Sequence, residues 1–354
     1  METVRFCFLA ALAIALPSPP VCAQSGVGRE PLAAVELGGE WGFINRGGGY
    51  VFDRHFEGAG VFSEGLAAVK IGNKWGYIDE TGKSAIGAQF DSAGDFSEGL
   101  ANVTIGGKVG YIDKSGTLAI AARFDHAWPF SCELALVETN HRRGYIDRAG
   151  KMVIEAQLDM ALPFSEGLAY VNQAGKKGFI NDKGLFVTDF PLDEGAGKFS
   201  EGLTVVEFEK KWGFIDNAGK LVIQPQFDYA FDFSEGLAAV GKDQHYSFID
   251  HEGRIVIPPR YSRALGCDGM KFSEGLTVIQ VDDQCDFIDQ TGTVVAHTEL
   301  HPMTLISSFS EGLAKFMLDD KWGYVDKTGR VVIAAKFDYA TDFSMPDKTA
   351  GPTF

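Results

Sequence analysis

Short apolar runs alternate with glycine-containing turns along almost the whole chain, and residues 66–99 show this pattern most clearly. Leu66 to Ile71 is an apolar run that fits a strand, and a Gly-Asn turn signal follows it. Trp75 to Asp79 predicts a second strand, because it is rich in aromatic and β-branched residues. After a tight turn that ends in glycine, Ser84 to Phe90 predicts a third strand, and the loop 91–99 follows. One unit is therefore predicted to be a three-stranded antiparallel meander.

The same unit recurs nine times in one register. The Phe that opens the motif Phe-Ser-Glu-Gly-Leu returns after 34, 34, 34, 35, 34, 39 and 37 residues, and a ninth copy follows 34 residues later. These landmark phenylalanines are Phe62, Phe96, Phe130, Phe164, Phe199, Phe233, Phe272, Phe309 and Phe343. Such regular self-similarity is the signature of a tandem repeat, in which each unit packs against its neighbours.

Comparison of the nine copies indicates which positions are buried. The Tyr77 position is aromatic in every copy, and the position after it, Ile78 here, is always Ile or Val. Adjacent strand residues point to opposite faces of a sheet, so both faces of this strand must be covered. A lone three-stranded sheet cannot cover both faces, whereas stacking each unit on the next one does.

Two motifs carry a family resemblance. They are W-G-[YF]-I-D-x-x-G-K, as in residues 75–83, and F-D-x-A-x-x-F-S-E-G-L-A, as in residues 90–101. With nine copies in register, the chain resembles the WG-repeat (KWG) family of bacterial proteins. The resemblance implies a β-rich tandem repeat protein that is frequently exported and usually has no assigned activity. It brings no catalytic motif to this sequence.

The predicted fold class is all-β, a tandem array of nine three-stranded antiparallel repeats of about 34 residues over residues 32–344. Two shapes remain open, an open superhelical stack and a closed β-propeller. Propeller blades typically have four strands. The chain also starts with a first strand, Leu32 to Val35, and ends on a complete unit, so no strand is evident that would close a ring. The open stack is therefore the preferred prediction.

The two ends of the chain are predicted to lie outside the repeats. Residues 1–23 read as a secretory signal, with Arg5, an apolar stretch too short to span a bilayer, and small residues before Gln24. Residues 24–31 form a short linker, and residues 345–354 a disordered tail. We expect an exported protein, periplasmic or extracellular, without a membrane span.

The charge distribution narrows the possible partners. A net charge of −16 argues against nucleic acid and against anionic membrane surfaces. The residue before the Trp position is nevertheless basic in six units, namely Lys74, Lys108, Arg142, Lys176, Lys211 and Lys321. This basic column is either a ladder of weak, exposed ion pairs or an anion-binding stripe. As a stripe it would be strongest at Arg142, Arg143, Lys176 and Lys177, where adjacent units double the charge.

Three cysteines follow the predicted signal. Cys267 and Cys285 are closest in sequence, and an oxidising compartment would permit a disulfide between them. However, Cys285 starts a predicted second strand while Cys267 precedes the first, so the two are expected near opposite ends of one hairpin. Cys132 stands where other units have Glu, and we expect it to be a packed thiol.

Two insertions fall in the same connection of two units, at residues 266–270 and between Ala296 and Phe309. Repeat proteins often place binding function in such loops, so Asp268, His297 and His301 are candidate site residues; neutral drift of a surface loop is the alternative. His297 and His301 do not form a metal motif, because Pro302 makes the required helix doubtful and a third ligand is not evident. We expect no metal.

The recurring polar residues favour structure over catalysis. The Ser-Glu pair returns in most units and fits turns, whereas an active site is a single convergence of groups. No nucleotide-binding or nucleophile motif is present, so we expect no enzyme activity and no cofactor. The predicted function is a non-catalytic binding or scaffold protein of the bacterial cell envelope, whose partner is a protein or a wall polymer. The alternative is a protein that binds a small ligand or metal, or hydrolyses a substrate, at the insertion loops around Cys267 and His297–His301.

Overall fold

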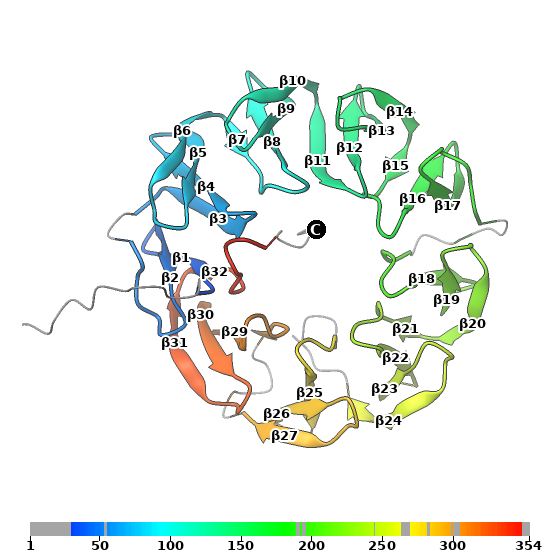
Figure 1. The fold of residues 1–354 in the computed structure, drawn as a ribbon. Helices are drawn as coiled ribbons and strands as arrows, with labels where there is room; N and C mark the ends of the chain where they lie inside the picture. The colour runs from blue at the N-terminus through cyan, green and yellow to red at the C-terminus, as the bar shows by residue number, and fades with distance from the viewer. Residues whose placement is uncertain are drawn as a thin grey trace, which may run out of the picture.

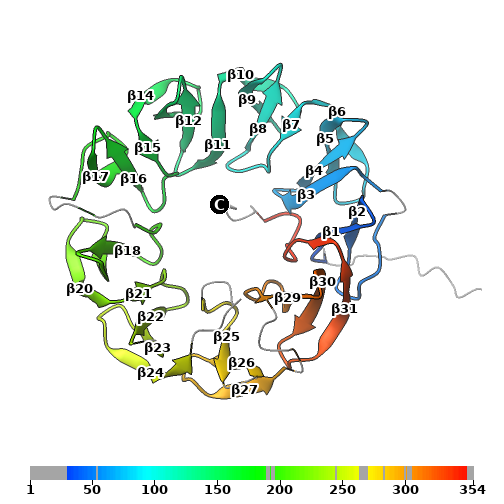
Figure 2. The same cartoon turned by 180° about the vertical axis from the view of Figure 1, so that it is seen from behind.

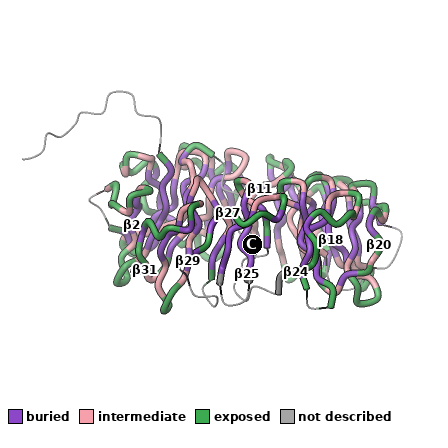
Figure 3. Tube along the Cα trace, turned by 90° about the horizontal axis from the view of Figure 1, so that it is seen from below, coloured by how far each residue is buried: buried purple, intermediate pink, exposed green. Residues whose placement is uncertain are grey.

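The computed structural model describes residues 30–52, 55–188, 192, 196–243, 245–262, 270–281, 284–298, 300 and 305–348, with the backbone alone at 260–262, 281 and 284. Within them the chain is all-β and forms nine small antiparallel blades around a central axis. The view from behind shows the same closed ring (Figure 2), and the side view shows a flat disc (Figure 3). In the described residues no helix is long and apolar enough to cross a membrane.

The blades follow the chain around the ring (Figure 1). Blade 1 contains β1 (Ala33–Leu37) and β2 (Glu40–Ile44); blade 2 β3 (Gly58–Ser63), β4 (Leu66–Ile71), β5 (Lys74–Asp79) and β6 (Ser84–Phe90); blade 3 β7 (Ser92–Ala93), β8 (Leu100–Ile105), β9 (Lys108–Asp113) and β10 (Leu118–Phe124); blade 4 β11 (His126–Ser131), β12 (Leu134–Thr139), β13 (Arg142–Ile146) and β14 (Met152–Leu158). Blade 5 contains β15 (Met160–Ala161), β16 (Leu168–Gln173) and β17 (Lys176–Asn181); blade 6 β18 (Leu203–Phe208), β19 (Lys211–Asp216) and β20 (Leu221–Phe227).

The remaining blades complete the circle. Blade 7 contains β21 (Tyr229–Ala230), β22 (Ala238–Lys242), β23 (His245–Ile249) and β24 (Ile255–Ser262); blade 8 β25 (Leu276–Val281), β26 (Gln284–Asp289) and β27 (Val294–His297); blade 9 β28 (Leu305–Ile306), β29 (Leu313–Leu318), β30 (Lys321–Asp326) and β31 (Val331–Phe337). The last strand, β32 (Tyr339–Ala340), belongs to blade 1. Blades 7 and 8 are joined into one sheet by the pair Ser262–Gln280.

The predicted all-β array of nine repeats is confirmed, and it closes into a nine-bladed β-propeller, which was the alternative shape; the preferred open stack is wrong. Strand β32 pairs with β1, with Ala340 opposite Val35 and Tyr339 opposite Glu36. Strand β32 is only two residues long and comes from the segment that the sequence indicated as a loop. The same segment gives a short fourth strand to other blades, as β7 does by pairing with β8. Several blades thus have four strands where three were expected.

A ring of serine hydrogen bonds joins all nine blades. The serine after each landmark Phe donates its hydroxyl to the carbonyl oxygen of the next landmark Phe, as Ser97 Oγ does to Phe130 O at 2.8 Å. The donors are Ser63, Ser97, Ser131, Ser165, Ser200, Ser234, Ser273, Ser310 and Ser344. The last bond, from Ser344 to Phe62 O at 3.4 Å, spans the two ends of the chain and completes the circle.

The glycine of the Trp-Gly motif allows the outer strand to pack closely. A Cβ on Gly110 would lie 2.5 Å from Ile120 O and 2.7 Å from Ala122 N, which are backbone atoms of β10. The ladder between β9 and β10 shifts register there, so the bulged backbone of β10 lies against the glycine. Any side chain at this position would push the outer strand away.

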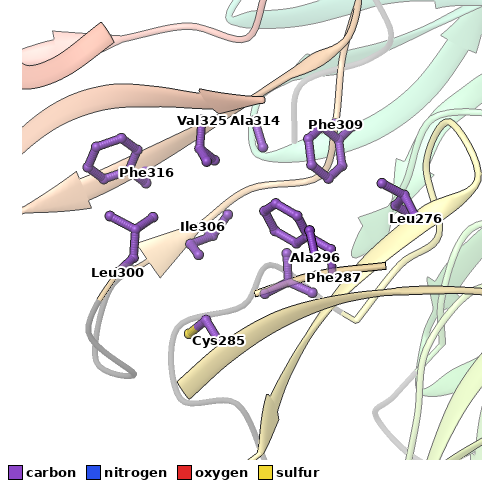
Figure 4. Packing of buried hydrophobic residues seen from close by; sticks show 11 residues of the cluster. Leu276, Cys285, Phe287, Ala296, Leu300, Ile306, Phe309, Ala314, Phe316 and Val325 are labelled. Atoms are coloured by element: carbon purple, nitrogen blue, oxygen red, sulfur yellow. The ribbon is translucent and has the colours of Figure 1, made fainter. Parts of the chain in front are cut away.

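The core lies between blades, as the two-sided burial of the Tyr77 strand predicted. Tyr77 and Ile78 are both buried, and Tyr77 lies 5.0 Å from the landmark Phe96 of the next blade. The same pair recurs around the ring; Figure 4 shows its version between blades 8 and 9, where Phe287 and Phe309 lie 4.9 Å apart. Each blade is thus covered by its neighbours.

The segment 345–348, where a disordered tail was expected, makes defined contacts. Glu64 N donates to Lys348 O at 2.8 Å, and Lys348 Nζ lies 2.6 Å from Glu311 Oε1. Figure 1 places this end of the chain inside the ring. Residues 349–354 and the predicted signal, residues 1–23, lie outside the described residues.

Candidate functional site

The Ser-Glu pairs, which would be tempting catalytic groups, hold turns together. Ser97 and Leu100 exchange two backbone hydrogen bonds, and the residues between them, Glu98 and Gly99, have φ values of 52° and 80°. This is a two-residue hairpin turn with both central residues left-handed. The Glu side chain then reaches the next turn, as Glu64 Oε2 accepts from Gly99 N at 3.0 Å. The predicted turn role is confirmed.

Among the described residues, five members of the basic column pair with aspartates. Lys74 Nζ lies 2.5 Å from Asp91 Oδ1, and the other oxygen of Asp91 accepts from Gly106 N of the next blade at 2.7 Å. The pairs that repeat this pattern are Lys108–Asp125, Arg142–Asp159, Lys211–Asp228 and Lys321–Asp338. The hydrogen bond from Lys74 holds the pKa of Asp91 below its usual value. These exposed pairs support the ladder interpretation for those units.

The four residues proposed as the strongest part of an anion stripe lie at equivalent positions of blades 4 and 5, at the starts of β13 and β17. Arg142 pairs with Asp159. Arg143 donates to Glu138 at 3.2 Å and lies over the ring of Trp128. Lys176 lies 4.0 Å from the ring centre of Phe186, and Lys177 is partly buried beside it in sequence. Anion binding here stays a prediction.

At the edge that carries the two insertions, His297 makes a polar contact with Asp286. His297 Nδ1 lies 2.9 Å from Oδ1 of the buried Asp286, and the His297 side chain is 70% exposed. Cys285 is buried, and Cys267, like Asp268 and His301, lies outside the described residues. Among the described residues no group of three or more His, Cys, Asp or Glu could hold a metal ion.

Cys132 is exposed rather than packed, so that expectation is wrong. It occupies the first left-handed position of its hairpin turn, with φ of 54°. Seven other units have Glu at this position, where the carboxylate can accept a hydrogen bond from the next turn, as that of Glu64 does from Gly99 N.

A cavity of about 370 Å³ between blades 5 and 6 has no counterpart among the predicted sites. Its lining comes from four consecutive blades and consists of Ser131, Leu162, Pro163, Phe164, Ser165, Leu168, Tyr170, Phe179, Ala196, Gly197, Lys198, Phe199 and Asp232. One sequence signal was available, because the spacing between Phe164 and Phe199 is 35 residues instead of 34.

Comparisons with known proteins agree with this fold. No curated protein matches the chain. A solved structure titled as a eukaryotic initiation factor has a TM-score of 0.65 at 11% identity and covers 91% of this chain and 100% of its own. A dihydro-heme d1 dehydrogenase, NirN, has a TM-score of 0.50 at 15% identity, with 94% of this chain and 78% of that chain covered. At these identities the likeness shows the fold alone.

The sequence comparison is more specific. A family model described as "WG containing repeat" matches nine segments, namely 41–75, 75–108, 110–140, 144–176, 178–212, 212–244, 246–285, 287–322 and 322–344. These segments span nearly all of the ring and follow the repeat register defined by the landmark phenylalanines. The chain therefore belongs to the family of WG-containing repeat proteins.

Proposed function

We propose that this chain is an exported, non-catalytic binding or scaffold protein of the bacterial cell envelope, which presents its ring to a protein or a wall polymer. The fold does not decide this, because a propeller can carry either a binding role or catalysis. The observation that supports the proposal is the use of the recurring polar groups. Ser97, Glu64 and Asp91 each bind backbone or side-chain groups of a neighbouring blade, so they serve ring assembly.

The stripe formed by Arg142, Arg143, Lys176 and Lys177 is the surface that we propose for an anionic partner. Both pairs belong to adjacent blades, and a repeat surface of this kind suits an extended polymer or a protein. The test is capture of a purified anionic wall polymer, and of an envelope extract, on the immobilised protein. A variant with all four residues changed to Gln should lose the captured partner.

The matched control is Lys74→Gln with Lys108→Gln, which removes charge at equivalent positions of blades 2 and 3. It should retain the partner. Capture that survives the fourfold change would contradict the stripe, and failure of the unmodified protein to retain any envelope component would contradict the binding role. Export is tested separately. If residues 1–23 are removed as a signal, sequencing of the secreted protein should find Gln24 as its first residue.

A second candidate function rests on the pair of Asp286 and His297. A buried carboxylate that holds one ring nitrogen of an exposed His leaves the other nitrogen directed to solvent, an arrangement suited to metal binding or proton transfer. Metal analysis of the purified protein would support this function if His297→Ala lowers the metal content. His245→Ala, at an exposed His of blade 7, should leave the content unchanged.

A further inference from the structure

The cavity between blades 5 and 6 has aromatic walls. Phe164, Phe179 and Phe199 are each at least 97% buried, and Tyr170 is 96% buried. The ring of Phe179 lies 5.1 Å from that of Phe199 and 5.5 Å from that of Tyr170. A volume of about 370 Å³ falls within the range of small-molecule sites, which are mostly apolar with a few placed polar groups.

Two residues of opposite charge line the same cavity, Asp232 and the exposed Lys198. Asp232 comes from the start of blade 7 and Lys198 from the start of blade 6. Within the described residues Asp232 has no hydrogen bond or ion pair, and burial raises the pKa of its carboxyl group despite the positive charges of Lys198 and Lys271. The carboxylate therefore lies in a partly desolvated place and gains most from a ligand that carries a hydrogen-bonding cation.

Gly197 makes room for this carboxylate. A Cβ at Gly197 would lie only 2.4 Å from Asp232 Oδ1 and 2.7 Å from a methyl group of Val205. The absence of a side chain thus leaves the carboxylate beside the aromatic walls. Asp95 has the same relation to Gly60, at 2.9 Å, but is not among the residues that line this cavity. Asp95 is therefore a matched control.

We propose that this cavity binds a free amino acid or short peptide with an apolar or aromatic side chain. Its ammonium group would bind Asp232, its carboxylate would bind Lys198, and its side chain would fill the space between Phe164, Tyr170 and Phe199. A carboxylate and an ammonium group at one apolar cavity complement a zwitterion better than a singly charged or neutral molecule. The inference goes beyond the proposed function, because the outer surface can hold its partner whether or not the cavity is filled.

The test is calorimetric titration of the full chain with L-phenylalanine and L-leucine, up to about 10 mM, where even a millimolar Kd would be detected. Two analogues separate the charges, phenethylamine without the carboxylate and 3-phenylpropionate without the ammonium group. L-phenylalanine should bind about tenfold or more tightly than either analogue, since each analogue loses one charged hydrogen bond. Equal binding of all three would overturn the zwitterion assignment, as would no binding of either amino acid.

Variants of Asp232 and Lys198 test which residue binds the ammonium group of the ligand and which binds its carboxylate. Asp232→Asn should weaken L-phenylalanine about tenfold and leave 3-phenylpropionate unchanged, because only the ammonium group contacts this residue. Lys198→Gln should weaken L-phenylalanine and leave phenethylamine unchanged. Asp95→Asn should bind every ligand as the unmodified protein does; an equal loss in Asp95→Asn and Asp232→Asn would contradict the site. Because the analogue series uses the unmodified protein, the result does not depend on whether a variant folds. Failure here would leave partner capture by the outer surface unaffected.

Discussion

The interface between blades 3 and 4 and the interface between blades 5 and 6 share the serine and glutamate links. They differ at the tyrosine position and in how their space is filled. In the first, Tyr111 of blade 3 donates its hydroxyl to Trp128 O of blade 4 at 2.7 Å. In the second, Phe179 occupies the tyrosine position and cannot donate, and the cavity lies beside it. Both nevertheless keep the serine bond, from Ser97 in one and Ser165 in the other.

The difference indicates how this ring tolerates a hollow interface. A polar link fixes the distance and register between two blades through a single short contact, whereas apolar filling is spread over many side chains. The filling can therefore vary between interfaces without opening the circle. Ser165 and Glu166 maintain blade 5 against blade 6 at 2.6 Å and 2.9 Å, respectively, close to the cavity.

The largest expected effect comes from the glycine of the Trp-Gly motif. Gly110→Ala should lower the free energy of unfolding by about 3 kcal/mol, because its Cβ would meet the backbone of β10, which cannot move without breaking the ladder. Gly178→Ala should cost about 1 kcal/mol, since its Cβ would meet side chains, and moving that of Thr188 loses only the hydrogen bond from Phe179 N to its Oγ1. Urea unfolding measures both. Equal losses would mean that a contact with strand backbone costs no more here than a contact with side chains.

The next largest effect is a gain in stability, and it is expected at Asp95, whose buried carboxylate lies against Gly60. Burial raises the pKa of Asp95 to about 6, so the folded state holds its proton more tightly than the unfolded state. Stability from this group is fully present below about pH 4 and is lost as the pH rises toward about 6. Asp95→Asn should therefore stabilise the protein at pH 7 by about 2 kcal/mol, and the gain should vanish near pH 4.

Thermal unfolding of both proteins across this pH range measures the difference. A gain that persists at pH 4 would show that the Asn side chain acts through a new contact rather than through the removed charge. Asp125, whose pKa is held low by the hydrogen bond from Lys108, is the natural control, because its neutralisation should destabilise the protein at pH 7. At pH 7 the two variants should thus change the stability of the protein in opposite directions.

Removing the serine hydroxyl should cost about 1 kcal/mol at either interface. Ser97→Ala leaves Phe130 O, and Ser165→Ala leaves Phe199 O, without this donor. Because the link is the same in both places, the two losses should agree in urea unfolding. A much smaller loss for Ser165→Ala would show that water in the cavity replaces the hydroxyl at Phe199 O. The strength of a serine link would then depend on how well the space between the blades is packed.

The comparison also shows what the sequence could predict. Landmark residues such as Tyr77 and Phe96 recur in register, and their burial follows from strand periodicity because every copy meets the same neighbours. Closure of the ring was missed because β32 has only two residues, too few for any apolar pattern, and its pairing with β1 joins distant parts of the chain. The cavity was missed because it depends on three-dimensional convergence of Gly197 and Asp232, which lie 35 residues apart.

The smallest expected effect is at the outer ends of the hairpins, where the basic column pairs with aspartates. Lys108→Ala removes the 2.5 Å contact with Asp125 between two exposed side chains. Water already screens such a pair, so Tm should fall by only about 1 °C, and the fall should disappear in about 1 M salt, where charges are screened within about 3 Å. Ser97→Ala should keep its full cost in the same salt, because its bond is between neutral groups.

If Lys108→Ala instead lowered Tm as much as Ser97→Ala and salt had no influence, the outer pairs would hold blades together as the serine ring does. The basic column would then be part of the framework at every interface, and Arg142 would be a poor candidate for binding a partner.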